Sequence, residues 1–217
     1  MDKEVSASDS VTLAETSRTE AFSDGVFAIV ITLLVLEIHR PDVQPGNLAG
    51  ALLAAWPAYA ANVLAFVYVG VIWLNHHSLF RVIRRADLKI QWINLAALGF
   101  TAFIPFPTGV MANAFQSGNL ADERAAVAAY ALVAGLMAAA WLPIFPYLQR
   151  HPKLAVPKLP ADFFARQIVR PIIGVVCYAL AALTGWFVHP LVGICFIVFM
   201  VGYHTATSEG IRTDAHR

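Results

Sequence analysis

Long stretches without charged residues alternate with short polar segments along the 217-residue chain. A membrane-spanning helix needs about 20 predominantly apolar residues, so each of these stretches is long enough to hold at least one crossing. The last stretch is 38 residues long and fits two crossings. Pro190 marks the break between them, since proline is best tolerated in the first turn of a new helix. The stretches that contain no Asp, Glu, Lys or Arg are residues 43–80, 90–121, 125–149 and 171–208.

A further apolar segment near the N-terminus raises the predicted number of crossings to six. We therefore expect an all-α integral membrane protein whose transmembrane domain covers residues 18–208, with polar cytoplasmic tails at residues 1–17 and 209–217. The turn Pro105-Phe106-Pro107 is expected to kink or end the third span. The predicted spans lie at about residues 21–39, 50–75, 88–112, 124–148, 166–187 and 190–208.

The composition and the charge distribution support a multi-pass membrane protein. Hydrophobic residues make up 59% of the chain, charged residues 13%, and the mean hydropathy is +0.64, whereas soluble domains are about half apolar and a quarter charged. If the N-terminus is cytoplasmic, only Arg40 and Arg124 of the fifteen Lys and Arg lie outside. This bias predicts that both termini are cytoplasmic, and we expect the protein to reside in the plasma membrane. The same bias accounts for the position of the basic residues, so we expect no nucleic-acid partner.

One face of the first span is an apolar stripe with a single hydroxyl group. On a helical wheel, Gly25 and the four residues Ile29, Thr32, Leu33 and Leu36 share an arc about 100° wide. One interpretation is that the stripe contacts lipid or the protein core. In the other, several copies of the helix surround a symmetry axis, and the rings of isoleucine and leucine form a pore closed by a hydrophobic constriction.

Polar residues gather near the inner end of the first three spans. A carboxylate such as Asp24 costs several kcal/mol in lipid unless it is paired. One interpretation is that Ser23 or Asp24 only caps the first helix. The other is a structural network in which Arg18, Ser23, Asp24, His77 and Asn94 satisfy one another.

The sequence offers little chemistry for catalysis or for metal binding. Adjacent residues of a helix point about 100° apart, so His76 and His77 do not readily bind one metal ion. Motifs for phosphate binding or nucleophilic catalysis are lacking, so we expect no enzyme, no metal and no cofactor. A membrane enzyme built on Asn75, His76 and His77 remains an alternative. Val201-Gly202-Tyr203 matches part of the TVGYG potassium filter, but it is predicted to lie inside a helix.

The first three spans resemble the family of endosomal and lysosomal transmembrane potassium channels and their bacterial relatives. The last three spans match this family only in length and topology. The residues that carry the resemblance are Arg18 with Phe22-Ser23-Asp24-Gly25-Val26-Phe27-Ala28-Ile29, then Trp73 with His76-His77-Ser78-Leu79-Phe80, then Asn94 and Pro105-Phe106-Pro107.

The resemblance implies that the first helix of each subunit lines a central pore that has no conventional filter. Animal members carry two repeats and work as dimers, so a single-repeat chain is expected to form a homotetramer. The constriction of the family corresponds to Ile29, and the layer above it to Thr32, Leu33 and Leu36.

The function implied by the resemblance is a potassium-selective channel. Potassium ions would cross partly hydrated, with selectivity arising from the dimensions of the neck and from the Thr32 hydroxyls. At the outer end, Glu37 and Asp42 either raise the local cation concentration or pair with Arg40 as solvated loop charges. A secondary transporter and a proton-permeable channel are the alternatives.

Overall fold

A computed structural model of the chain describes residues 7–39 and 43–208, and these residues are mostly helical. Six helical segments are long and apolar enough to cross a membrane, which confirms the predicted six-helix membrane fold. They cover Thr16–Glu37, Trp56–Phe80, Leu88–Ser117, Leu120–Arg150, Phe163–Phe187 and Pro190–Thr207. The individual elements are α1 (Ala7–Leu33), η1 (Leu34–Glu37), α2 (Leu48–Ala54), α3 (Trp56–Phe80), α4 (Leu88–Ala102), α5 (Pro105–Ser117), α6 (Leu120–Trp141), α7 (Ile144–Arg150), η2 (Pro152–Leu154), α8 (Phe163–Gln167), α9 (Val169–Phe187) and α10 (Pro190–Thr207).

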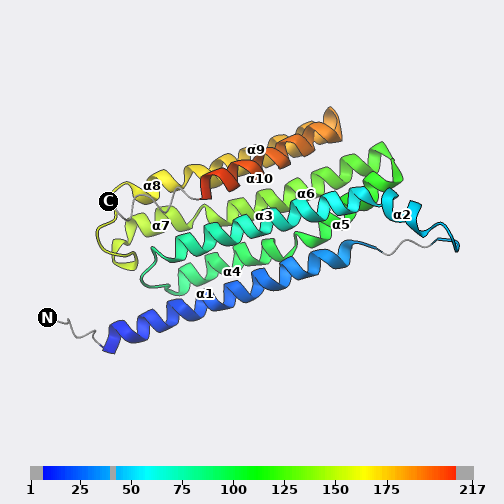
Figure 1. Cartoon of the computed structure of the whole chain (residues 1–217). Helices are drawn as coiled ribbons and strands as arrows, with labels where there is room; N and C mark the ends of the chain where they lie inside the picture. The colour runs from blue at the N-terminus through cyan, green and yellow to red at the C-terminus, as the bar shows by residue number, and fades with distance from the viewer. Residues whose placement is uncertain (1–6, 40–42, 209–217) are drawn as a thin grey trace.

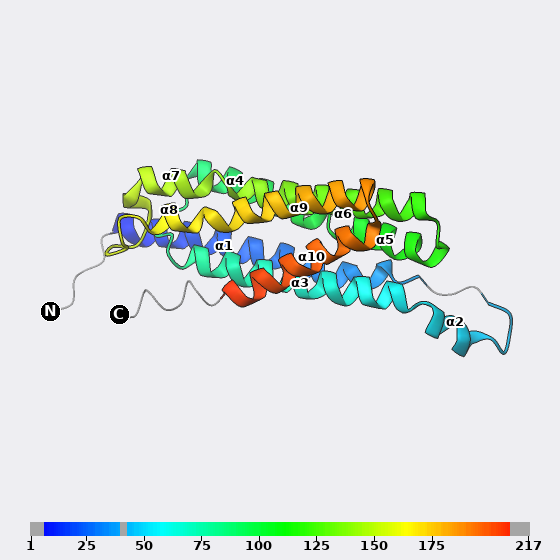
Figure 2. The same ribbon diagram turned by 90° about the horizontal axis from the view of Figure 1, so that it is seen from above.

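The helices form an elongated bundle in which α1 lies at one edge and the α9–α10 pair at the other (Figure 1). Helix α1 packs against α3 and α4, whereas α9 packs mainly against α6 and α10. The start of α1 and the end of α10 lie at the same end of the bundle, together with α7 and α8, and α2 lies at the opposite end (Figure 2). This placement follows from an even number of crossings.

Proline residues break or begin several of the spans. The third crossing is bent between α4 and α5, and Pro105 begins the second half. The Pro-rich turn is therefore a kink within one span, which continues to Ser117. Pro143 separates α6 from α7, and Pro190 begins α10 directly after the N-cap residue His189. At each position proline removes a backbone donor where the helix has the least need of one.

The first helix begins earlier than predicted. The sequence predicts a polar tail over residues 1–17, but α1 starts at Ala7 and runs without interruption into the membrane span. The costly step in helix formation is nucleation, and the membrane segment supplies a helix that needs only to be extended. Thr16 also holds this region in place, since its hydroxyl donates to the carbonyl of Arg84 and accepts from the amide of Ala86.

Small residues bring the helices of the second half close together. Ala126, Ala131 and Ala134 of α6 and Ala181 of α9 are buried, and small side chains allow the backbones of membrane helices to approach closely. Helices α9 and α10 approach closely, since a Cβ atom built on Gly193 would lie 3.0 Å from Cα of Gly185.

We expect Gly193→Ala to destabilise the protein by about 1–3 kcal/mol, the usual cost of overpacking. A Cβ atom at this position would lie 2.6 Å from the carbonyl oxygen of Ala181 and 2.6 Å from Cγ1 of Val127, and backbone atoms cannot move aside easily. Gly202→Ala on the same helix is the matched control, because nothing lies within 4 Å of its Cβ position. Thermal unfolding in detergent should separate the two variants, and equal midpoints would contradict the close contact.

Candidate functional site

Helix α1 has one buried face and one uncovered face. Ser23, Phe27, Val30 and Leu34 are at most 1% exposed, and their spacing of three or four residues places them on one side of the helix. They pack against the rest of the subunit. A single subunit therefore fixes the rotation of α1 about its own axis.

The uncovered face carries the stripe found in the sequence. Ile29 is 59% exposed, Leu33 41% and Leu36 69%, and Thr32 is exposed as well. The hydroxyl of Thr32 donates within its own helix, to the carbonyls of Ile29 (2.8 Å) and Ala28 (3.1 Å). Its oxygen still has a lone pair directed away from the helix, so it can face an ion or water.

A buried chain of hydrogen bonds joins α1 to α4 and α3. The Ser23 hydroxyl donates to the carbonyl of Thr19 (2.8 Å) and accepts from Nδ2 of Asn94 (2.9 Å). Oδ1 of Asn94 in turn lies 3.0 Å from Nε2 of His76. Because this oxygen can only accept, Nε2 of His76 carries the hydrogen and Nδ1 remains an acceptor. All three side chains are at most 2% exposed.

The aromatic surroundings explain why His76 is the inward histidine. Its ring stacks on Phe80 at 4.3 Å and meets Phe27 and Trp141 edge-on. His77 points to the outer side of α3, as its position 100° further round the helix requires. There its ring stacks on Trp73, and Nδ1 lies 2.8 Å from Oε1 of Glu20.

The structure corrects the membership of the predicted polar network. Ser23 and Asn94 belong to it, but their partner is His76 rather than His77. Asp24 forms a separate contact, since Oδ1 accepts from Nε1 of Trp73 (2.8 Å). Arg18 is exposed and lines a wide surface depression with Thr19, Phe22, Gln91, Asn94 and Leu95.

A contact that the sequence did not indicate holds the C-terminal end of α1. Where α1 tightens into η1, the carbonyl of Leu34 accepts a hydrogen bond from Nδ2 of Asn62 on α3. Glu37 at the end of η1 lies against Gly109 of α5, where a Cβ atom would meet Oε2 of Glu37 at 1.9 Å. Asp42 and Arg40, the other charged residues considered at this end, lie outside the described residues.

The other residues considered for metal binding or for an ion filter do not form such a site in the described part of the chain. Within residues 7–39 and 43–208, no three His, Cys, Asp or Glu residues lie close enough together to hold a metal ion. The segment Val201-Gly202-Tyr203 lies inside α10, where its carbonyls serve the helix. The features that stand out are the apolar stripe of α1 and the hydrogen-bonded chain behind it, which together define a six-helix membrane protein with a specialised first helix.

Comparisons with known proteins agree with this class. The model of the family described as endosomal/lysosomal potassium channel TMEM175 matches residues 18–105. A potassium channel of Streptomyces collinus is 40% identical over 167 residues, which cover 76% of this chain and 80% of the relative. A potassium channel of Chamaesiphon minutus is 36% identical over 196 residues, covering 85% and 92%. The chain belongs to the TMEM175 family.

A solved structure and a vertebrate relative extend the comparison. The crystal structure of a lysosomal potassium-selective channel TMEM175 homolog from Chamaesiphon minutus superposes with a TM-score of 0.75 at 30% identity, covering 90% of this chain and 98% of that chain. The human endosomal/lysosomal proton channel TMEM175 is 40% identical over 97 residues, which cover 41% of this chain and 19% of the human protein. The likeness to the vertebrate protein is therefore confined to one part of each chain.

We expect Asn94→Ala to lower the free energy of unfolding by about 1–3 kcal/mol, because it leaves the buried Nε2 of His76 without a partner. Ser78→Ala is the control, since that hydroxyl is exposed and bonds only to the carbonyl of Leu74 in its own helix. It should change stability by no more than about 0.5 kcal/mol. Denaturation in detergent followed by circular dichroism measures both. Equal stability of the two variants would show that the buried chain does not hold α1.

Proposed function

We propose that this protein is a potassium-selective channel whose pore is lined by α1 of each subunit. The observation that carries the proposal is the pair of opposite faces on α1. One face is fixed by burial and by the Ser23–Asn94–His76 chain, and the other presents Ile29, Thr32, Leu33 and Leu36 uncovered. Membership of the TMEM175 family, with relatives named potassium channels, supports the same function.

The assembly we propose is a homotetramer with the uncovered stripe of α1 at its axis. Closed rotational symmetry would bring four copies of Ile29 into one ring, with Leu33 and Leu36 forming further rings along the axis. In the single subunit a large part of this stripe is exposed, with Ile29 at 59% and Leu36 at 69%, so it is available to meet its own copies. We further propose that the protein resides in the plasma membrane. The Lys and Arg distribution favours an orientation with both termini in the cytoplasm.

Conduction would be controlled by wetting of the apolar neck. A narrow ring of isoleucine side chains excludes water, and an ion that cannot keep part of its hydration shell does not pass. A small widening of the ring admits water and therefore ions. Thr32 lies one turn along the stripe from Ile29, and its hydroxyl oxygens would replace water molecules lost by potassium in the neck. Permeation needs no cofactor and no catalytic residue.

Proton permeation is the second candidate, because the vertebrate relatives are named proton channels. Planar-bilayer recording of the purified oligomer separates the two. Asymmetric potassium, sodium and proton gradients give a reversal potential that follows the permeant ion. A reversal potential at the potassium equilibrium supports the proposal, and one at the proton equilibrium contradicts it. Saturable flux coupled to a counter-ion would instead indicate a secondary transporter.

We expect Ile29→Ala to raise potassium flux into liposomes several-fold, because a smaller side chain widens and wets the neck. Ile29→Asn should reduce the preference for potassium over sodium. Ile172→Ala is the matched control, because Ile172 is also exposed but lies on α9, away from the proposed axis. Flux and ion preference that stay unchanged in both Ile29 variants would place the constriction elsewhere.

The proposed axis also predicts a specific cross-link. With Cys177 and Cys195 replaced by serine, Ile29→Cys should form disulfides between subunits under mild oxidation, because the ring brings these positions together. Ile172→Cys, which faces outward on α9, should not. Non-reducing gel electrophoresis reads the dimer band, and light scattering of the uncross-linked protein should give four times the 23.6 kDa chain. A monomeric mass, or cross-linking of both variants alike, would contradict the arrangement.

A further inference from the structure

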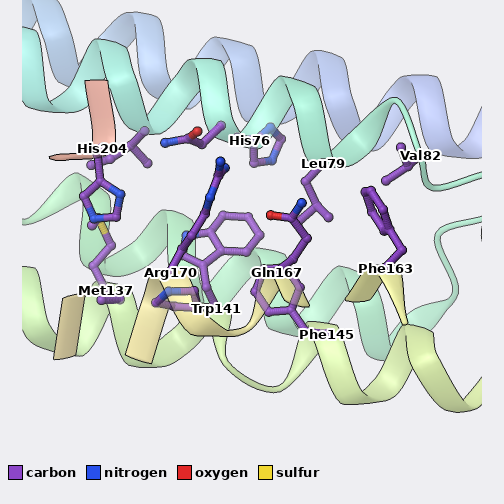
Figure 3. A pocket seen from close by; sticks show the side chains of 14 residues that line it. His76, Leu79, Val82, Met137, Trp141, Phe145, Phe163, Gln167, Arg170 and His204 are labelled. Carbon is purple, nitrogen blue, oxygen red and sulfur yellow. The ribbon is translucent and has the colours of Figure 1, made fainter. Parts of the chain in front are cut away.

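A partly open cavity of about 100 Å³ lies between α3, α6, α9 and α10 and close to α7 and α8 (Figure 3). It lies on the side of α3 that faces away from α1. Its volume is comparable to that of an engineered cavity that holds a single aromatic ring. The cavity is separate from the stripe proposed to line the pore.

Most of the cavity wall is apolar. Aromatic and aliphatic side chains from several helices surround it, namely Leu79, Met137, Trp141, Phe145 and Phe163. Figure 3 shows the rings of Trp141, Phe145 and Phe163 around one side of the space. Water alone would leave this wall poorly solvated, whereas an apolar body of one ring or a few methylene groups would cover it.

Two buried acceptors line the same cavity without a hydrogen-bond partner. Nδ1 of His76 and Oδ1 of Asn75 make no hydrogen bond to any described part of the chain. His76 is only 2% exposed, and the donation of its Nε2 to Asn94 leaves Nδ1 with a bare lone pair. An unsatisfied buried acceptor costs about 1–3 kcal/mol. A hydroxyl group or a water molecule inside the cavity would satisfy both atoms by donating a hydrogen bond.

The described lining of the cavity carries a positive charge and contains no carboxylate. Arg170 is half-buried, and one of its terminal nitrogens donates to the carbonyl of Thr207. Its guanidinium reaches into the space between His204 and His76 (Figure 3). Asp and Glu are absent from the lining residues of the described chain. A guanidinium with free N–H groups beside an apolar wall favours an anion.

We infer that this cavity binds a small amphipathic anion, a carboxylate or phosphate head carrying an acyl or aromatic body. The head accepts hydrogen bonds from Arg170, and the apolar body lies against Trp141, Phe145 and Phe163. A hydroxyl of the ligand, or a water molecule that enters with it, donates to Nδ1 of His76. A free fatty acid and the end of an anionic phospholipid share this chemistry.

The occupant would act on α1 through His76. The imidazole contacts the cavity with Nδ1 and the Asn94–Ser23 chain with Nε2, so a ligand that shifts the ring also shifts the anchor of α1. This consequence rests on the proposed channel function, whereas binding itself does not. Binding and flux are therefore measured separately.

The binding test uses terminally brominated octanoate, because bromine quenches the fluorescence of a nearby tryptophan. In nanodiscs of neutral lipid, the wild type should show a saturable quenching component that Trp141→Phe removes. Arg170→Gln should weaken the apparent affinity at least about tenfold, as expected for loss of a charge-assisted hydrogen bond. Arg166→Gln is the matched control, since Arg166 is exposed, pairs with Asp162 and does not line the cavity.

The head group is tested on the wild type without any mutation. Terminally brominated octanol has the same body and no charge, so it should show only the linear quenching of partition into lipid. Saturable quenching by both probes, or equal affinity in Arg170→Gln, would overturn the anion site. Linear quenching by octanoate as well would show that only water occupies the cavity.

Two further arms identify the source of the ligand and its effect. If octanoate binding weakens when the nanodisc contains phosphatidylglycerol in place of phosphatidylcholine, the natural occupant is a bilayer lipid. If it does not, the occupant is a free amphipathic acid. Potassium flux that responds to octanoate in the wild type but not in Arg170→Gln supports the coupling to α1. Flux that ignores octanoate disproves the coupling alone, and absence of any flux disproves the channel function while leaving the binding result intact.

Discussion

The structure depends on the hydrogen-bonded chain from Thr19 through Ser23 and Asn94 to His76. The Ser23 hydroxyl, the oxygen and nitrogen of the Asn94 amide and Nε2 of His76 are linked to one another within an apolar interior, where a broken link would leave a costly unsatisfied group. Hydrophobic packing alone is tolerant of rotation, because isoleucine and leucine side chains of a membrane helix pack almost as well against lipid as against protein. The directed hydrogen bonds fix which face of α1 turns inward.

Once this face is fixed, the position of the stripe follows. Phe27, Val30 and Leu34 continue the buried side above Ser23, and the 3.6-residue period then places Ile29, Thr32 and Leu36 on the outer side. The contact of Asn62 with the carbonyl of Leu34 secures the far end of the helix. Polar bonds at both ends therefore hold a helix whose uncovered face is almost entirely apolar. A precise apolar constriction requires this rigidity, because its width is set by helix position rather than by charged groups.

The six crossings could be predicted from the sequence, because hydrocarbon excludes charged residues. The stripe of α1 could be predicted as well, because the period of an α-helix is fixed. The partner of Asn94 could also have been predicted, because His76 continues the spacing of Ala61, Ala65, Tyr68 and Ile72 along the buried side of α3. The contact of Asp24 with Trp73 could not, since it depends on the relative rotation of two helices. The helix over residues 7–17 could not be predicted either, because apolar residues do not recur there with a helical period. This helix is an extension of the membrane span, which hydrophobicity alone defines.

The imidazole of His76 connects two environments that otherwise do not meet. Its two nitrogens are inequivalent because Asn94 directs its amide nitrogen to Ser23 and its amide oxygen to His76. This oxygen requires Nε2 to donate and leaves Nδ1 of the neutral ring as an acceptor toward the cavity. The ring is held between Phe80, Phe27 and Trp141, so it can tilt only together with its neighbours. A small tilt displaces Asn94 and with it the Ser23 anchor. In the proposed pore, the wetting of the apolar neck depends on its width, so a movement of α1 would change the passage of ions.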